Sequence, residues 1–375
     1  MKNAVLALLF FGALVIAFSS TGQAGVFFGP SVVGGTGNAS VVYADGNYPP
    51  SGYTFPWAPN PFTQPACAND PCATPSDFMD SNSTAMVTSL YNSYGFNLGN
   101  LYEGLPPDNT FPTYYTSTND PVFNVYCDAG CGSGSPLSVR IPNGATASSG
   151  SDHHLDVINL STGVETLIGQ FNETGPGTGG TSNPVYNGGT IYAGYAGVCT
   201  LTAFASFGNA CQNGGTGSKL PSQPLVVDPR EVNAGAVNHT IFIATGCSST
   251  SYVFPAGASD GLCGANGPKY GERLWLDLTQ AQINALGNNA CITTILINMH
   301  KYGWMIADNN GGGSAINIQA VGPTSFTLWG LTNPWTTFWT NCTGSPSGNA
   351  LTIPTTGITQ SNIHVLGVCV NEGNC

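Results

Sequence analysis

Only 7% of the 375 residues are charged, against roughly 25% in typical soluble domains, and seven Lys and Arg against nineteen Asp and Glu give a formal net charge of −12. With so few cations the surface has no basic face for a phosphate backbone, so we expect no nucleic-acid partner. Fifty Gly and 26 Pro make a turn-rich chain that favours short strands, and a hydrophobic share of 41% is too high for global disorder.

Residues 1–24 have the features of a secretory signal peptide. Lys2 is followed by an apolar run over 4–18 and by the small-residue cleavage motif Gly-Gln-Ala at 22–24. The run is too short for a permanent membrane span, and no later stretch is long enough. We therefore expect a secreted protein, extracellular or periplasmic, with no membrane span in the mature chain.

All twelve cysteines follow this segment. An even count in an exported chain indicates disulfides, and the close pairs are too isolated from one another for a zinc site. We expect no metal and no cofactor. Pairing of neighbours along the chain predicts these bridges: Cys67–Cys72, Cys127–Cys131, Cys199–Cys211, Cys247–Cys263, Cys291–Cys342 and Cys369–Cys375.

The N-terminal region, 25–120, is rich in Pro, Gly and Asn, and we expect it to pack as an extended segment on the main body, 121–375. One helix is predicted over 77–94, where Met86, Leu90 and Tyr94 recur at helical spacing. Further helices are predicted over 279–287 and 291–302. Strands are predicted over 121–125, 137–141, 151–160, 164–171, 237–244, 252–255, 273–278, 303–308, 315–321 and 363–370.

No repeat and no long polar linker divides the main body. The pattern favours one mainly β domain, a disulfide-stapled β-sandwich of jelly-roll type with a few short helices and a C-terminal extension. Trp329, Trp335 and Trp339 in that extension could form a flat platform for sugar rings, although core packing is the more frequent fate of tryptophan.

Charged and histidine side chains gather between residues 220 and 309, which is informative in a chain so poor in charge. Glycoside hydrolysis needs two carboxyl groups on opposite sides of the scissile bond. We predict Glu231 and Asp308 as this acid/base pair, with Asp152 as an alternative partner and with His239 and His154 in supporting positions.

Eliminative cleavage of an acidic polysaccharide needs a base and a cation beside the substrate carboxylate. His239 or Tyr302 could be that base, and Lys301 or Arg273 that cation. Asn309 completes the predicted substrate-binding set. Metal ligation by His154, His239 and an aspartate is also conceivable, but the spacing names no metal.

Each of these residues also has a structural interpretation. His239 shares a strand face with apolar residues and could be a hydrogen-bonded core histidine, and Glu231 could belong to a structural corner. Asp152 and Asp308 border turns, where aspartate commonly caps backbone N–H groups. Lys301 could simply end a helix, where its charge suits the helix dipole.

The ordered motifs resemble those of a group of uncharacterised secreted bacterial β-sandwich proteins. They are Asp-His-His at 152–154, Glu-Val-Asn-Ala-Gly at 231–235 with His239, Tyr-Val-Phe-Pro-Ala at 252–256, Gly-Glu-Arg-Leu-Trp-Leu at 271–276, Lys-Tyr-Gly at 301–303 and Ala-Asp-Asn at 307–309. The resemblance covers residues 121–310 and implies a β-sandwich or jelly-roll fold rather than a particular reaction. This chain departs from the group at His153, where an arginine is usual, and at Asn238, where an aspartate is usual.

These features favour a secreted protein that acts on or binds an extracellular polysaccharide, as a glycoside hydrolase, a polysaccharide lyase or a binding protein. The alternative is a non-catalytic component of the cell surface, an extracellular matrix or a filament, for which dense disulfides provide durability. An acid-stable peptidase ranks lower, because no nucleophile–base pair is recognisable.

Overall fold

The computed structural model describes residues 60–66, 78–103, 110–128, 131, 134, 136–148, 152–159, 161–172, 189–206, 211–212, 216–311 and 313–375. These residues belong to one compact unit. The predicted signal peptide and the predicted bridge Cys67–Cys72 lie outside the described residues.

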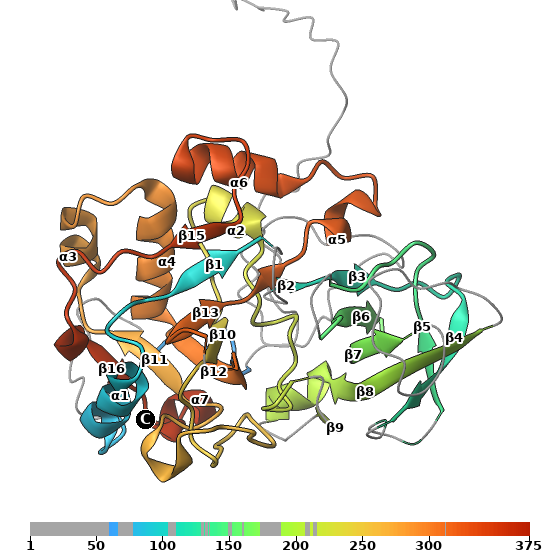
Figure 1. Cartoon of the computed structure of the whole chain (residues 1–375), viewed down its shortest axis with the longest axis horizontal. Coiled ribbons are helices and arrows are strands. Elements are labelled where there is room, and N and C mark those ends of the chain that lie inside the picture. Colours follow the sequence, from blue (N-terminus) through green and yellow to red (C-terminus); the bar gives the residue numbers. More distant parts are fainter. Residues whose placement is uncertain are drawn as a thin grey trace, which may run out of the picture. The chain divides into compact units, whose positions relative to one another are not determined.

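Two mixed β-sheets dominate the structure (Figure 1). Sheet I has the strand order β3 (Thr113–Tyr115), β6 (Leu155–Asn159), β7 (Val164–Asn172), β8 (Thr190–Thr200), β4 (Val122–Cys127) and β5 (Leu137–Arg140), and β9 (Cys211–Gln212) also pairs with β8. Sheet II has the order β15 (Ala350–Thr352), β1 (Asn100–Tyr102), β13 (Ile316–Ile318), β10 (Ile241–Thr245), β12 (Trp304–Asn309), β11 (Arg273–Leu276) and β16 (Ile363–Val365). A short parallel pair joins β2 (Thr110–Phe111) to β14 (Ala320–Val321).

The mainly β architecture confirms the coarse prediction, but the jelly-roll connectivity is not confirmed. Jelly rolls are built from antiparallel strands, whereas β3–β6 and β4–β8 in sheet I and β1–β13 and β10–β12 in sheet II are parallel pairs. Strands β1 and β3 come from the predicted N-terminal region, and they are members of the two sheets rather than of a separate covering segment.

Several short helices accompany sheet II (Figure 1). They are α1 (Ser83–Asn92), α2 (Pro229–Asn233), α3 (Gln280–Ala285), α4 (Ala290–Lys301), α5 (Thr324–Thr327), α6 (Pro334–Thr343) and α7 (Val368–Glu372), with 3₁₀ turns at η2 (Leu201–Ser206), η3 (Gly264–Asn266) and η4 (Gln360–Asn362). Helix α4 contacts strand β11 and helices α2, α3 and α6, and α1 contacts β16. Among the described residues, no helix has the length and apolar character needed to cross a bilayer.

The two predicted helices over 279–302 are confirmed as α3 and α4, and their caps follow from the sequence. The Thr279 hydroxyl accepts the Gln282 N–H, and the Gln282 side chain accepts the Thr279 N–H, which forms a capping box. The Asn289 side chain accepts the Ile292 N–H at 3.0 Å and so begins α4. Gly303 follows the end of α4 with φ of 75°, a conformation that favours glycine.

Other predicted elements differ from the structure. The helix predicted over 77–94 is shorter, and the segment 252–255 is not a strand but contributes one isolated bridge from Tyr252. The strand predicted over 363–370 is β16 followed by α7. Trp335 and Trp339 lie in α6, stacked 6.0 Å apart and buried, so they are core residues rather than a sugar platform.

Five of the predicted disulfides are present: Cys127–Cys131, Cys199–Cys211, Cys247–Cys263, Cys291–Cys342 and Cys369–Cys375. A large apolar cluster fills the space between sheet II and its helices, and a second, smaller cluster covers one face of sheet I. Both are needed because each sheet must bury its own apolar face.

A buried pair of acids joins sheet I to the segment 216–228. The Ser222 hydroxyl donates to Asp156 in β6, and its backbone N–H donates to Glu165 in β7 at 2.6 Å. All three residues have no exposed surface, and Asp156 Oδ1 and Glu165 Oε2 have no hydrogen-bond partner among the described residues. Burial raises the pKa of Glu165 to about 7, and burial together with the Glu165 charge raises that of Asp156 well above its usual range.

Candidate functional site

The carboxyl ends of the parallel strands β10 and β12 bring several predicted site residues to one edge of sheet II. In open sheets with parallel strands, ligands bind outside this edge. The register shifts between Ile243 and Ala244, since Ile243 pairs with Ile306 but Ala244 pairs with Asp308. Such a bulge turns a side chain away from the regular alternation and is frequent beside active sites. Here it places Asp308 at the end of β12.

One carboxyl oxygen of Asp308 is anchored and the other is available. Oδ1 accepts the backbone N–H of Asn309 at 2.9 Å and that of Gly217 at 3.2 Å. Oδ2 has no partner in the part of the chain that the structure describes. Burial, and then the negative charge of Asp260, raise the pKa of Asp308 to about 7, against the smaller opposing effects of the two N–H donors and of His154. Asp308 can therefore hold a proton near neutral pH.

Asp260 supplies a second carboxyl group beside Asp308. It lies in the loop closed by the Cys247–Cys263 disulfide, and the Tyr270 hydroxyl donates to its Oδ1 at 2.5 Å. Burial and the bond to Asp260 raise the pKa of Tyr270 above its usual range, so this hydroxyl remains a donor. Asp260 is exposed to solvent, and Asn309 Nδ2 lies 3.5 Å from the backbone oxygen of Asp260.

The Asp152–His154 pair lies at the start of β6 and acts on the same site through its charge. His154 Nε2 is 3.8 Å from Asp152 Oδ2, and the hydrogen bond to His154 lowers the pKa of Asp152. The imidazole is buried and forms a T-shaped contact with the ring of Phe111, at a centroid distance of 4.7 Å. The predicted strand begins only at Leu155, because His153 has φ of 39° and interrupts the extended backbone.

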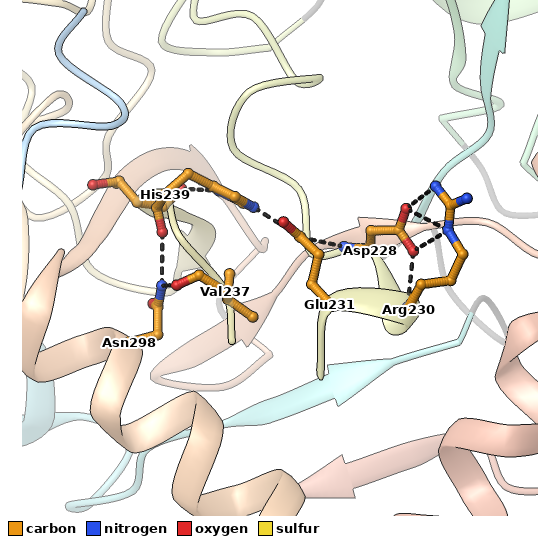
Figure 2. Close-up of polar contacts among 7 residues, drawn as sticks. Asp228, Arg230, Glu231, Val237, His239 and Asn298 are labelled. Carbon is orange, nitrogen blue, oxygen red and sulfur yellow. Dashed lines mark hydrogen bonds and ion pairs between the residues drawn. The ribbon is translucent and has the colours of Figure 1, made fainter. Parts of the chain in front are cut away.

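Glu231 and His239 form a separate cluster (Figure 2). Asp228 caps α2 through the Arg230 N–H, and Glu231 closes the capping box by accepting the Asp228 N–H. Glu231 Oε2 also lies 3.1 Å from His239 Nε2. Asn298 in α4 donates to the backbone oxygen of His239 at 2.7 Å, which fixes the segment that precedes β10. These hydrogen bonds thus connect α2 and α4 to the start of β10.

The hydrogen bonds of this cluster require the charged form of the histidine. His239 Nδ1 lies 2.9 Å from the Thr240 carbonyl oxygen, which can only accept, so Nδ1 carries a proton. Nε2 faces a carboxylate, which also accepts, so Nε2 carries the second proton. Burial opposes this charge, but the charge and the hydrogen bond of Glu231 together raise the pKa of His239. With both nitrogens occupied, His239 has no lone pair for a base or a metal ligand.

The predicted cation Arg273 is a structural residue and not a substrate-binding one. It is fully buried, and its guanidinium donates to the backbone oxygens of Pro61, Gln64 and Tyr302 and to the side chain of Asn371. These bonds engage four of its five N–H groups, and the side chain has no exposed surface, so the guanidinium is not accessible to a substrate carboxylate.

Lys301 is the last residue of α4, and Tyr302 follows it as the C-cap before the start of β12. Lys301 is exposed, with its Nζ 5.3 Å from the centre of the Tyr302 ring, and Tyr302 is buried. The Tyr302 carbonyl accepts the Thr240 hydroxyl at 3.1 Å, so these residues lie at the same edge of sheet II as His239.

The predicted pair Glu231 and Asp308 is therefore not brought together. His239 precedes the first residue of β10, whereas Asp308 pairs with Ala244, five positions further along. At about 3.3 Å per residue this separates the two edges by about 16 Å, well beyond the ~5–9.5 Å between the carboxyls of glycosidase pairs. One edge therefore holds Asp152, His154, Asp308 and Asn309. The opposite edge holds the other predicted residues, which are Glu231, His239, Arg273, Lys301 and Tyr302.

Asp260 and Tyr270 were missed by the sequence reasoning. Neither belongs to a recognisable motif, and the only signal was that Asp260 lies within a small cysteine loop, where a polar side chain is held in place. The described residues contain no cluster of His, Cys, Asp and Glu suited to a metal ion.

Comparison of the chain with protein-family models, with curated proteins and with solved structures gives no match. The resemblance to secreted bacterial β-sandwich proteins stays a prediction.

Proposed function

We propose that this protein is an exported hydrolase of extracellular glycans, with Asp308 as the general acid and Asp260 as the general base. The observation that carries the proposal is the pair formed by Asp308, at the carboxyl end of β12, and Asp260, in the disulfide-closed loop that follows β10, each with one anchored and one available oxygen. Glycoside hydrolysis uses two carboxyl groups of this kind, one protonated and one ionised.

The environments of the two groups suit different roles. Asp308 has a pKa raised to about 7, so near neutral pH it can donate a proton to the leaving oxygen through Oδ2. Asp260 is exposed to water, and its carboxylate is oriented by the Tyr270 hydroxyl, so its free oxygen can take a proton from an attacking water. The charge of His154 limits the rise in the pKa of Asp308 and keeps it in a useful range.

Export is part of the proposal. It is supported by the predicted signal peptide and by the five disulfides of the described residues, since structural disulfides persist in oxidising compartments. A glycan substrate fits such a location and the hydrolytic pair. The lyase alternative is less favoured, because both of its predicted bases are occupied or buried: His239 is already doubly protonated and Tyr302 is buried. Of its predicted cations, Arg273 is sequestered and only Lys301 is exposed.

The test is release of reducing ends and of unsaturated products from neutral and acidic glycans between pH 4 and pH 9. We expect reducing ends without unsaturated products, and a fall in kcat above pH 7 as Asp308 loses its proton. Asp308→Asn and Asp260→Asn should each lower kcat by about 10²–10⁴-fold. The matched control is Asp277→Asn, which changes an exposed aspartate that pairs with His364 at 3.5 Å, away from the site.

A full rate for Asp308→Asn, or a rate of Asp277→Asn as low as that of the two site variants, would refute the assignment. No turnover and no binding on any glycan would instead support the non-catalytic alternative, a structural component of the cell surface or matrix.

A further inference from the structure

Three cations of the described residues are held by polar structural partners. Arg230 pairs with Asp228 at 2.5 Å, Lys269 pairs with Glu272 at 2.8 Å, and Arg273 donates four hydrogen bonds. Arg140 at the end of β5 differs from these. Its Nη1 donates to the backbone oxygen of Asp120 at 2.6 Å, and no carboxylate of the described residues lies within ion-pair distance.

Arg140 lines a pocket of 280 Å³ on sheet I. The pocket is lined by residues of β5, β6 and β7, although β8 and β4 separate β5 from β7 in the strand order. Its polar lining also includes Thr116, Ser138, Asn159, Thr162 and Thr166. Its volume is just below the ~300 Å³ at which pockets for drug-sized ligands begin. It therefore suits a ligand of about one sugar ring.

The lining combines three kinds of contact. The remaining guanidinium nitrogens of Arg140 and the hydroxyl of Thr166 have no hydrogen-bond partner among the described residues, so they can bind a ligand without losing a protein contact. Val139, Val157 and Val164 supply an apolar wall. A guanidinium fork matches a carboxylate, hydroxyls and an amide match ring hydroxyls, and the valines suit the C–H face of a ring.

We propose that this pocket binds a carboxylate-bearing sugar of the uronic acid class, with the carboxylate on Arg140 and the ring hydroxyls on the Thr166 side. The part-buried Arg140 guanidinium has no carboxylate partner among the described residues, and an anionic ligand supplies the counter-ion.

The proposed uronate pocket is distinct from the aspartate pair and does not depend on catalysis there. Asn159 and His154 lie at opposite ends of β6, five residues apart, which is about 16 Å along the strand. Binding at the pocket and turnover at Asp308 can therefore be measured and lost separately.

The test is calorimetric titration of the full mature protein with D-galacturonate and with D-galactose, its neutral counterpart. We expect galacturonate to bind at least about tenfold more tightly, as a charge-assisted hydrogen bond provides. The preference should weaken as salt is added, because the pocket is open to solvent. A further titration with trigalacturonate distinguishes a glycan chain from a free sugar acid as the ligand. Tighter binding of the trimer than of the monomer supports a glycan chain, and equal binding supports the free acid.

Arg140→Gln should remove the preference for galacturonate while galactose binding remains, and Arg140→Lys should restore part of it. Lys301→Ala is the matched control, because it removes an exposed cation at the far edge of sheet II and should change nothing. Thr166→Val keeps the side-chain volume and should weaken both sugars several-fold, which provides a second readout should Arg140→Gln unfold.

Equal affinity for galacturonate and galactose in the native protein would overturn the proposal. So would a preference that survives Arg140→Gln in a folded variant, or one that is lost equally in Lys301→Ala.

Discussion

Replacing Glu165 by glutamine should stabilise the protein at alkaline pH and leave its stability in acid nearly unchanged. The buried Asp156–Glu165 pair is the reason. Glu165 has a pKa of about 7 in the folded chain against 4.5 for the free side chain. Between these values the native state holds a proton that the unfolded chain has lost, so stability falls as the pH rises. The full contribution is present below pH 4.5 and is lost as the pH rises through about 7.

The size of the effect follows from the shift. A difference of 2.5 units at ~1.36 kcal/mol per unit corresponds to about 3 kcal/mol. With an unfolding entropy of ~2.1 cal/mol/K per residue over 375 residues, this equals a change of about 4 °C in Tm. Glutamine keeps an oxygen for the Ser222 N–H and carries no charge, so Glu165→Gln should melt about 4 °C higher at pH 8 and at the same temperature at pH 4.

Thermal unfolding followed by circular dichroism at the two pH values measures this difference directly. Glu372→Gln is the control, because Glu372 is an exposed glutamate in α7 and its replacement should shift neither curve. The reasoning fails should Glu165→Gln destabilise the protein equally at both pH values, or should the native protein gain stability between pH 5 and pH 8 relative to the variant.

Three further predictions concern the structural residues. Glu231→Gln breaks a buried ion pair and should lower the free energy of unfolding by about 3 kcal/mol at pH 6. This loss of stability should shrink as the pH rises through the raised pKa of His239. Denaturant melts at pH 6 and pH 9 measure it, and the same loss at both pH values would contradict the prediction. Arg273→Lys cannot reproduce the guanidinium's bonds and should cost more than about 3 kcal/mol in the same assay, so a loss within error would refute its structural role. Removing the Cys291–Cys342 bridge, with a sequence separation of 51, should cost about 4 kcal/mol by loop entropy, and a loss under about 1 kcal/mol would exclude that origin.

The local features of the chain were the most predictable. Thr279 with Gln282, and Asn289 ahead of an apolar run, mark the starts of α3 and α4 because capping depends on residues within one helical turn. Bridges between neighbouring cysteines were predictable for a similar reason, since short loops bring their ends together at low entropic cost. The strand predicted over 252–255 failed because only Tyr252 forms a bridge, to Tyr270, and no ladder continues from it.

The candidate site was only partly predictable. Asp308 was predicted as an acid/base group, but the partner now proposed, Asp260, was not, because Asp260 comes close only through the Cys247–Cys263 loop and the Tyr270 hydroxyl. Glu231 was assigned to the same site on its residue type alone. Sequence does not reveal that β10 and β12 pair and run parallel, and that direction decides whether two polar side chains share an edge or stand about 16 Å apart.

The amino-acid sequence by itself determined the mainly β character, the scarcity of charge, the helix caps and the disulfides between neighbours, because each depends on composition or on residues close in the chain. Only the tertiary structure decided which charged groups meet. The order and direction of β10 and β12 sent His239 and Asp308 to opposite edges, and the fold enclosed Asp156 with Glu165 and left Arg140 facing an open pocket. Such pairings depend on contacts between residues far apart in the chain, whose strand order and orientation no local pattern encodes.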